Sequence, residues 1–170
     1  MNHYDWSAKL QALYNKALRA YQQGVSDAGA LFTQEESLEL SSVGLKPINV
    51  FDYVEDFVKY GEPGWNEFLL VAAARRDYYL YELHCARPAP PIREADLPAK
   101  TEAIEGIEWL PRITLKARCF LEGTLPHEIM YGCGGDRRFL KQHDIHLADF
   151  LRMTWAARGD AAKILKFLRK

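Results

Sequence analysis

The sequence has few cysteines, no long apolar run and almost no net charge, and each shortage excludes a class of protein. Three cysteines in 170 residues are too few and too scattered for a disulfide framework. No apolar stretch approaches the ~20 residues that a membrane-spanning helix needs. Residues 1–6 lack the basic start and the apolar stretch of a signal peptide. We therefore expect a cytoplasmic protein with no membrane partner and with free cysteines that fill space as small apolar side chains.

The charge balance gives no reason to expect a polyanionic partner. The formal net charge is −1, and 48% of the residues are hydrophobic and 26% charged. These are ordinary values for a globular protein with a hydrophobic core. Because no excess of positive charge is present, we expect no nucleic-acid partner.

Apolar residues recur at three- to four-residue spacing along most of the chain, which is typical of amphipathic helices. No segment shows the two-residue alternation of a half-buried strand, so we predict an all-α fold without a sheet. The expected caps are Thr33 (as a capping box), Asn49, Asp136 and His146. The expected helices lie near residues 6–23, 34–43, 50–60, 63–85, 111–122, 137–143, 147–158 and 161–169.

Residues 86–100 interrupt the helical pattern and contain four of the eight prolines. Such a segment cannot form a regular helix, and consecutive prolines favour a semi-rigid linker. An SH3-type ligand is the alternative interpretation of a proline-rich stretch. We predict an N-terminal helical unit at 1–87, a proline-rich linker at 88–100 and a C-terminal helical unit at 101–170.

The two predicted units match when one is shifted by 100 residues. This shift pairs Lys16-Ala17 with Lys116-Ala117 and Leu40 with Leu140. The match favours an internal duplication, with two similar small helical units packed together across the proline-rich linker. The alternative is chance, because any two amphipathic helices can be aligned in apolar register.

The glycine-rich stretch Gly132–Asp136 is the best candidate for a ligand site. A glycine loop that enters a helix can present backbone N–H groups to an anion, and nearby arginines can add bidentate contacts. The pattern is neither a P-loop nor a dinucleotide-binding fingerprint, and a tight turn also explains the glycines. The candidate ligand-binding residues are Gly132, Gly134, Gly135, Asp136, Arg137 and Arg112, with a small anionic ligand as the expected partner.

Two other chemistries have weaker support in the sequence. The residues Cys119, His127, Cys133, His143 and His146 lie close together, but their separations do not match the usual spacing of zinc ligands, so we predict no metal and no cofactor. Cys133 resembles an activated nucleophile in its position near a helix start. No histidine is placed beside it by the sequence, and the catalytic residues, if the protein is an enzyme, are unknown.

The second half of the chain resembles a known family in its order of short motifs. These are Trp109-Leu110-Pro111-Arg112, Gly123-Thr124-Leu125-Pro126 and Tyr131–Asp136, followed by Phe139-Leu140 and residues 145–150. Residues 101–170 are in this respect similar to the bacterial domain-of-unknown-function 5069 family. The resemblance implies a bacterial protein but no activity. Residues 83–88, Leu-His-Cys-Ala-Arg-Pro, are similar to the end of that family's sequences, which suggests that the first half is a divergent second copy.

Two functions follow as hypotheses. The first is a protein-interaction or structural and regulatory module without catalysis, whose partner is another protein or a second copy of the chain. The second is a binding protein or enzyme for a small molecule or a phosphate ligand, which would use the glycine loop Gly132–Asp136 and the nearby arginines.

Overall fold

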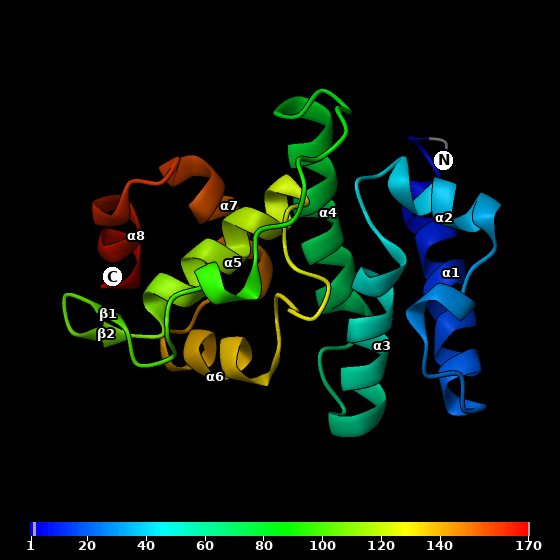
Figure 1. Ribbon diagram of the computed structural model, residues 1–170, viewed down its shortest axis with the longest axis horizontal. Coiled ribbons are helices and arrows are strands. Elements are labelled where there is room, and N and C mark those ends of the chain that lie inside the picture. Colours follow the sequence, from blue (N-terminus) through cyan, green and yellow to red (C-terminus); the bar gives the residue numbers. More distant parts are fainter. Residues whose placement is uncertain (2, 170) are drawn as a thin grey trace. The chain divides into compact units, whose positions relative to one another are not determined.

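The chain folds into two compact units, Met1–Cys85 and Ala86–Lys170, in a computed structural model that describes residue 1 and residues 3–169 (Figure 1). Helices make up 61% of the structure, which confirms the all-α prediction. One local departure is a small antiparallel hairpin of β1 (Ala103–Ile104) and β2 (Ile107–Glu108). The chain turns at Gly106, and the two-residue strands are too short to produce a visible alternating pattern.

The described residues of unit 1 form four α-helices and one 3-10 turn. They are α1 (Trp6–Gln22), η1 (Ala28–Ala30), α2 (Gln34–Ser41), α3 (Pro47–Tyr60) and α4 (Trp65–Tyr81). The predicted capping box at Thr33 is confirmed, because its hydroxyl accepts from the backbone N–H of Glu36 while Glu36 accepts from the N–H of Thr33. Helix α1 packs against α3, and the apolar stripes of these helices, with Leu10 and Val54 fully buried, form the core of the unit.

In unit 2, residues 86–169 also form four α-helices, preceded by the hairpin and a 3-10 turn. They are η2 (Glu94–Asp96), α5 (Leu110–Glu122), α6 (Gly134–Gln142), α7 (Leu147–Ala157) and α8 (Ala161–Leu168). Helix α7 packs against both α5 and α8. Fully buried side chains of α5 and α7, including Ile113, Phe150 and Leu151, form the core.

The proline-rich segment lies against unit 2. The N–H of Ile92 donates to the carbonyl of Thr124 (3.0 Å), and Leu97 is buried. The guanidinium of Arg112 donates to the carbonyl of Pro98 (2.8 Å). These contacts explain why the division between the units falls at Cys85, before the prolines, rather than within them.

Two of the four predicted N-caps, Asn49 and Asp136, are wrong. Helix α3 begins at Pro47 with Lys46 as its N-cap, and Asn49 lies one turn further on, where its side chain accepts from the N–H of Lys46. Proline suits the first helical position because its missing N–H would have no partner there.

The second wrong N-cap, Asp136, lies in the glycine loop. Helix α6 begins at Gly134, with Cys133 as N-cap, so Gly134 and Gly135 are helical and Asp136 is not the cap. The expected cap failed because the Asp136 carboxylate is used in a tertiary cluster, which a local pattern does not reveal.

The turns after the second helix of each unit have the same geometry. In unit 1 the N–H of Leu45 donates to the carbonyl of Leu40, and in unit 2 the N–H of Ile145 donates to the carbonyl of Leu140, both at 3.0 Å. The residue before each donor has a left-handed backbone, with φ of 75° at Gly44 and 53° at Asp144. All three positions are separated by 100 residues.

Candidate functional site

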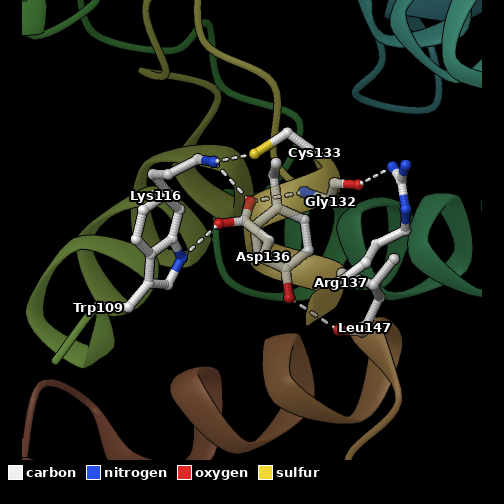
Figure 2. A network of polar contacts seen from close by, with 8 residues as sticks. Trp109, Lys116, Gly132, Cys133, Asp136, Arg137 and Leu147 are labelled. Atoms are coloured by element: carbon white, nitrogen blue, oxygen red, sulfur yellow. Dashed lines mark hydrogen bonds and ion pairs between the residues drawn. The ribbon is translucent and has the colours of Figure 1, made fainter. Parts of the chain in front are cut away.

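Asp136 is the centre of a buried polar cluster in unit 2 (Figure 2). Its side chain is fully buried and accepts three hydrogen bonds. The indole Nε1 of Trp109 donates to Oδ1 at 3.0 Å. The ammonium of Lys116 and the N–H of Gly132 donate to Oδ2, at 2.5 and 2.9 Å. A buried carboxylate needs such partners because desolvation strongly disfavours an unpaired charge.

Lys116 is brought to this cluster by the apolar face of α5. It follows Ile113 by three residues and precedes Ala117, and all three residues are buried. Its ammonium lies between two groups, the carboxylate of Asp136 and the sulfur of Cys133, which is 3.3 Å away. Cys133 itself is half-buried at the N-cap of α6.

Trp109 and Gly135 depend on one another. Trp109 precedes α5 in a left-handed conformation, with φ of 68°, and its indole lies over the start of α6. A Cβ atom placed on Gly135 would be 2.5 Å from Cζ2 of that ring. Only glycine therefore allows the indole to reach Asp136.

Gly132 is held from both sides by neighbouring charged residues. Its N–H donates to Asp136, and its carbonyl accepts from Nη1 of Arg137 at 2.7 Å. Gly132 has φ of 91°, a conformation that favours glycine. The preceding residue, Tyr131, donates a hydrogen bond from its hydroxyl to the carbonyl of Leu147 at 2.8 Å. The loop is thus fixed to both α6 and α7.

The structure brings five of the six candidate residues together at the start of α6. The exception is Arg112, whose guanidinium is directed to the carbonyl of Pro98. Arg137 is buried and contacts its own loop. The five that meet are Gly132, Gly134, Gly135, Asp136 and Arg137.

Two members of the cluster, Trp109 and Lys116, were not among the candidates. A signal for Lys116 was present, because a lysine within a buried apolar stripe requires a nearby carboxylate. Trp109 stood out only as part of the family-like motif Trp109-Leu110-Pro111-Arg112, which did not indicate its role, since that role depends on contact with residues 26 and 27 positions further along the chain.

The chemistry of the cluster is that of a fixed ion pair. Both oxygens of Asp136 are occupied by donors, and the side chains of Lys116 and Asp136 are 3% and 0% exposed. A general base must be free to take a proton from a substrate, whereas this carboxylate holds a loop and two helices. Among the described residues, no group of three or more His, Cys, Asp or Glu side chains is arranged to hold a metal ion.

Cys119 and His146, two of the other predicted reactive residues, have structural roles. Cys119 is buried within α5, and burial is the main cause that raises the pKa of its thiol. His146 caps α7, as predicted, by accepting from the N–H of Ala148 at 3.1 Å.

Unit 1 contains an ion pair at the equivalent positions. The ammonium of Lys16 on α1 lies 2.5 Å from the carboxylate of Glu36, the third residue of α2. These residues precede Lys116 and Asp136 by 100 positions each. In unit 1, however, the two side chains are 40% and 24% exposed, and Thr33 replaces Cys133 as the N-cap of the second helix.

Comparisons of the chain with protein-family models, with curated proteins and with solved structures give no match. None of the described helices combines the length and the apolar character needed to cross a membrane. The fold and the site therefore define the class as a helical protein with a buried lysine–aspartate cluster.

Proposed function

We propose that this chain is a non-catalytic protein-interaction module that associates with a second copy of itself through helix α4. The observation that carries this proposal is the exposure of large apolar side chains on α4. Leu70 is 43% exposed and Tyr81 is 67% exposed. They are eleven residues apart, which is about three helical turns, so both lie on the same side of the helix.

The distribution of residues around α4 also bears on the proposed contact surface. Phe68, Val71 and Ala72 are fully buried in unit 1, so one side of the helix is already used. The side with Leu70 and Tyr81 also includes Asp77, whose carboxylate pairs with Arg76, so exposed apolar side chains and charged groups lie next to each other there. Exposed apolar side chains rimmed by polar residues are typical of a protein-interaction surface.

A second copy is the partner that fits this surface with the fewest assumptions. The same helix from two copies can pair about a twofold axis, so that Leu70 and Tyr81 contact their own equivalents. The net charge of −1 adds little repulsion between copies. Aromatic side chains such as Tyr81 are also enriched at interfaces.

The Asp136 cluster supports a structural role for unit 2. Its polar groups bind each other and the backbone, so the cluster stabilises a rigid support rather than a reaction centre. An interaction module requires such rigidity because ordering a loose surface on binding costs free energy.

Size-exclusion chromatography with light scattering tests the proposal. The wild-type protein is expected to change from monomer to dimer as its concentration rises, and Leu70→Glu is expected to remain monomeric because it places a charge in the interface. Leu38→Glu is the matched control, since Leu38 is 64% exposed on α2 and lies outside the proposed surface. A wild-type protein that stays monomeric at all concentrations would contradict self-association.

A ligand site at the glycine loop is the second candidate. Gly134 favours it, because this exposed residue opens α6 and its ideal Cβ position is 3.8 Å from Nη2 of Arg137. The carboxylate of Asp136 in the same helical turn opposes an anion. Shifts of the Gly134 and Gly135 amide resonances during a titration with inorganic phosphate are expected if the loop binds, and unchanged resonances rule the loop out.

We also propose that the two units descend from an internal duplication. The Lys16–Glu36 and Lys116–Asp136 pairs support it, together with the matching turns at Gly44 and Asp144. Common descent explains the constant separation of 100 residues better than chance apolar register, because polar pairs and left-handed turn residues are not part of an amphipathic pattern. Experimental structures of the units test this, and different paths of α1–α3 and α5–α7 would exclude it.

A further inference from the structure

The proline segment before η2 is extended. Residues 86–93 contain no helix, strand, turn or bend, and local covalent geometry explains this. Its three prolines, Pro88, Pro90 and Pro91, have φ fixed at about −65°, and the residue before each of them is confined to extended backbone. Arg93 has φ of −77° and ψ of 146°, which are the values of a polyproline II helix. The prolines therefore restrain the segment to this conformation before any partner binds.

The C-terminal end of the segment is fixed to unit 2. The N–H of Ile92 donates to the carbonyl of Thr124 at 3.0 Å, and Leu97 is buried. The guanidinium of Arg112 donates to the carbonyl of Pro98. Because the conformation and the attachment are both already set, a partner that binds the segment loses little conformational entropy in ordering it.

Much of the segment is accessible to a partner. A polyproline II helix has three residues per turn, so residues three apart share a side. Pro88 and Pro91 lie on one side, Pro90 and Arg93 lie on a second, and Ile92 lies on the third. Pro90, Pro91 and Arg93 are exposed, whereas Pro88 and Ile92 are half-buried. Two sides of the helix thus present proline rings or an arginine to solvent.

Positive charge flanks the prolines. Arg87 and Arg93 are both exposed, and no acidic residue lies between them. The side chain of Arg93 is 82% exposed and pairs with Asp96, whose side chain is 42% exposed. Because water solvates both charges, this ion pair contributes little to stability. A carboxylate of a partner can therefore take the place of Asp96.

We propose that residues 87–93 are a ligand for a peptide-binding domain of the SH3 type, with a groove lined by aromatic side chains and an acidic pocket at one end. The spacing of Pro88 and Pro91 places two prolines on one side of the helix, where aromatic grooves bind them. The charge of Arg93, two residues later, matches the acidic pocket. The contact uses no residue of α4 or of the glycine loop, so it is tested independently of both.

Isothermal titration calorimetry of the full chain with a panel of SH3 domains that carry an acidic pocket tests the proposal. The wild-type protein is expected to bind at least one domain with a micromolar Kd. Pro91→Ala and Arg93→Glu are each expected to weaken this binding by roughly tenfold or more, because they remove a groove contact and reverse a charge. Both residues are exposed, so the variants should fold, which circular dichroism checks.

The ion pair of Arg93 gives a sharper prediction. Asp96→Ala frees the guanidinium and is expected to tighten binding by roughly two- to fivefold, which is the contribution of an exposed ion pair expressed as affinity. Glu94→Ala is the matched control. It removes an exposed carboxylate of the same 3-10 turn and leaves the Arg93–Asp96 pair in place, so it should bind as the wild type does.

Any of three results would overturn the proposal. The first is the absence of binding by every domain of the panel. The second is an equal affinity of the wild type, Pro91→Ala and Arg93→Glu, which would place the contact elsewhere on the chain. The third is an affinity of Asp96→Ala no higher than that of Glu94→Ala, which would exclude Arg93 from the contact.

Discussion

At the residue scale, two ion pairs, Lys116–Asp136 and Lys16–Glu36, show how burial changes the contribution of an ion pair to the stability of the fold. Both pairs join a lysine on the first helix of a unit to the third residue of the second helix. In unit 1 water solvates the charges, so the pair contributes little. In unit 2 the desolvated charges depend on each other, and the loss of one partner leaves the other buried and unpaired.

Asp136→Asn is therefore expected to destabilise unit 2 by about 3–5 kcal/mol, the range measured when a buried ion pair loses one partner. Glu36→Gln, the matched change in unit 1, should cost no more than about 1 kcal/mol. Urea denaturation followed by circular dichroism measures both free energies of unfolding. Adding Lys116→Met to Asp136→Asn should restore part of the loss. Equal losses in the two single variants would show that burial of the cluster is unimportant.

Gly135 provides a second prediction at the residue scale. Gly135→Ala forces its new methyl group against the Trp109 ring, so the indole must move away from Asp136. We expect a loss of about 1–3 kcal/mol, as for other overpacked sites, with a change in tryptophan fluorescence. Gly134→Ala is the control, because its nearest neighbour is 3.8 Å away and it should be nearly neutral. A neutral Gly135→Ala would indicate that the ring does not lie over α6.

At the scale of single elements, local signals were sufficient where the chain caps its own helices. The capping box at Thr33, the left-handed Gly123 after α5 and the cap at His146 all appear in the structure. Asn49 and Asp136 failed as caps because α3 begins at Pro47 and α6 at Gly134, which places both residues inside their helices. The hairpin at 103–108 was missed because two-residue strands have no measurable period.

Helix α8 gives the element-scale prediction. Its N-cap Asp160 accepts from the N–H groups of Ala162 and Lys163, at 3.0 and 3.4 Å. Asp160→Ala is expected to cost about 1 kcal/mol, the usual value for a lost N-cap, and to speed hydrogen exchange in the first turn of α8. Glu102→Ala changes an exposed carboxylate away from any helix start and should leave exchange in α8 unchanged. Unaltered exchange in Asp160→Ala would mean that packing alone holds α8.

At the scale of the whole molecule, each unit has its own buried core and its own ion pair. The fragment 86–170 contains every residue of the Asp136 cluster and the docked proline segment. We expect this fragment to fold alone, with a helical circular dichroism spectrum and one cooperative urea transition. The fragment 1–85 should do the same, because its core lies entirely within the unit. A fragment without a cooperative transition would show that the units fold only together.

The sequence by itself determined the helical class and most helix boundaries, because apolar periodicity, caps and glycine turns act over a few residues. Only the tertiary structure decided that Lys116 and Trp109 meet Asp136 and that Arg112 binds the proline segment. It also decided that the buried Nη1 of Arg75 has no hydrogen-bond partner among the described residues. These facts depend on contacts between distant positions and on the exclusion of water, and neither leaves a local pattern in the chain.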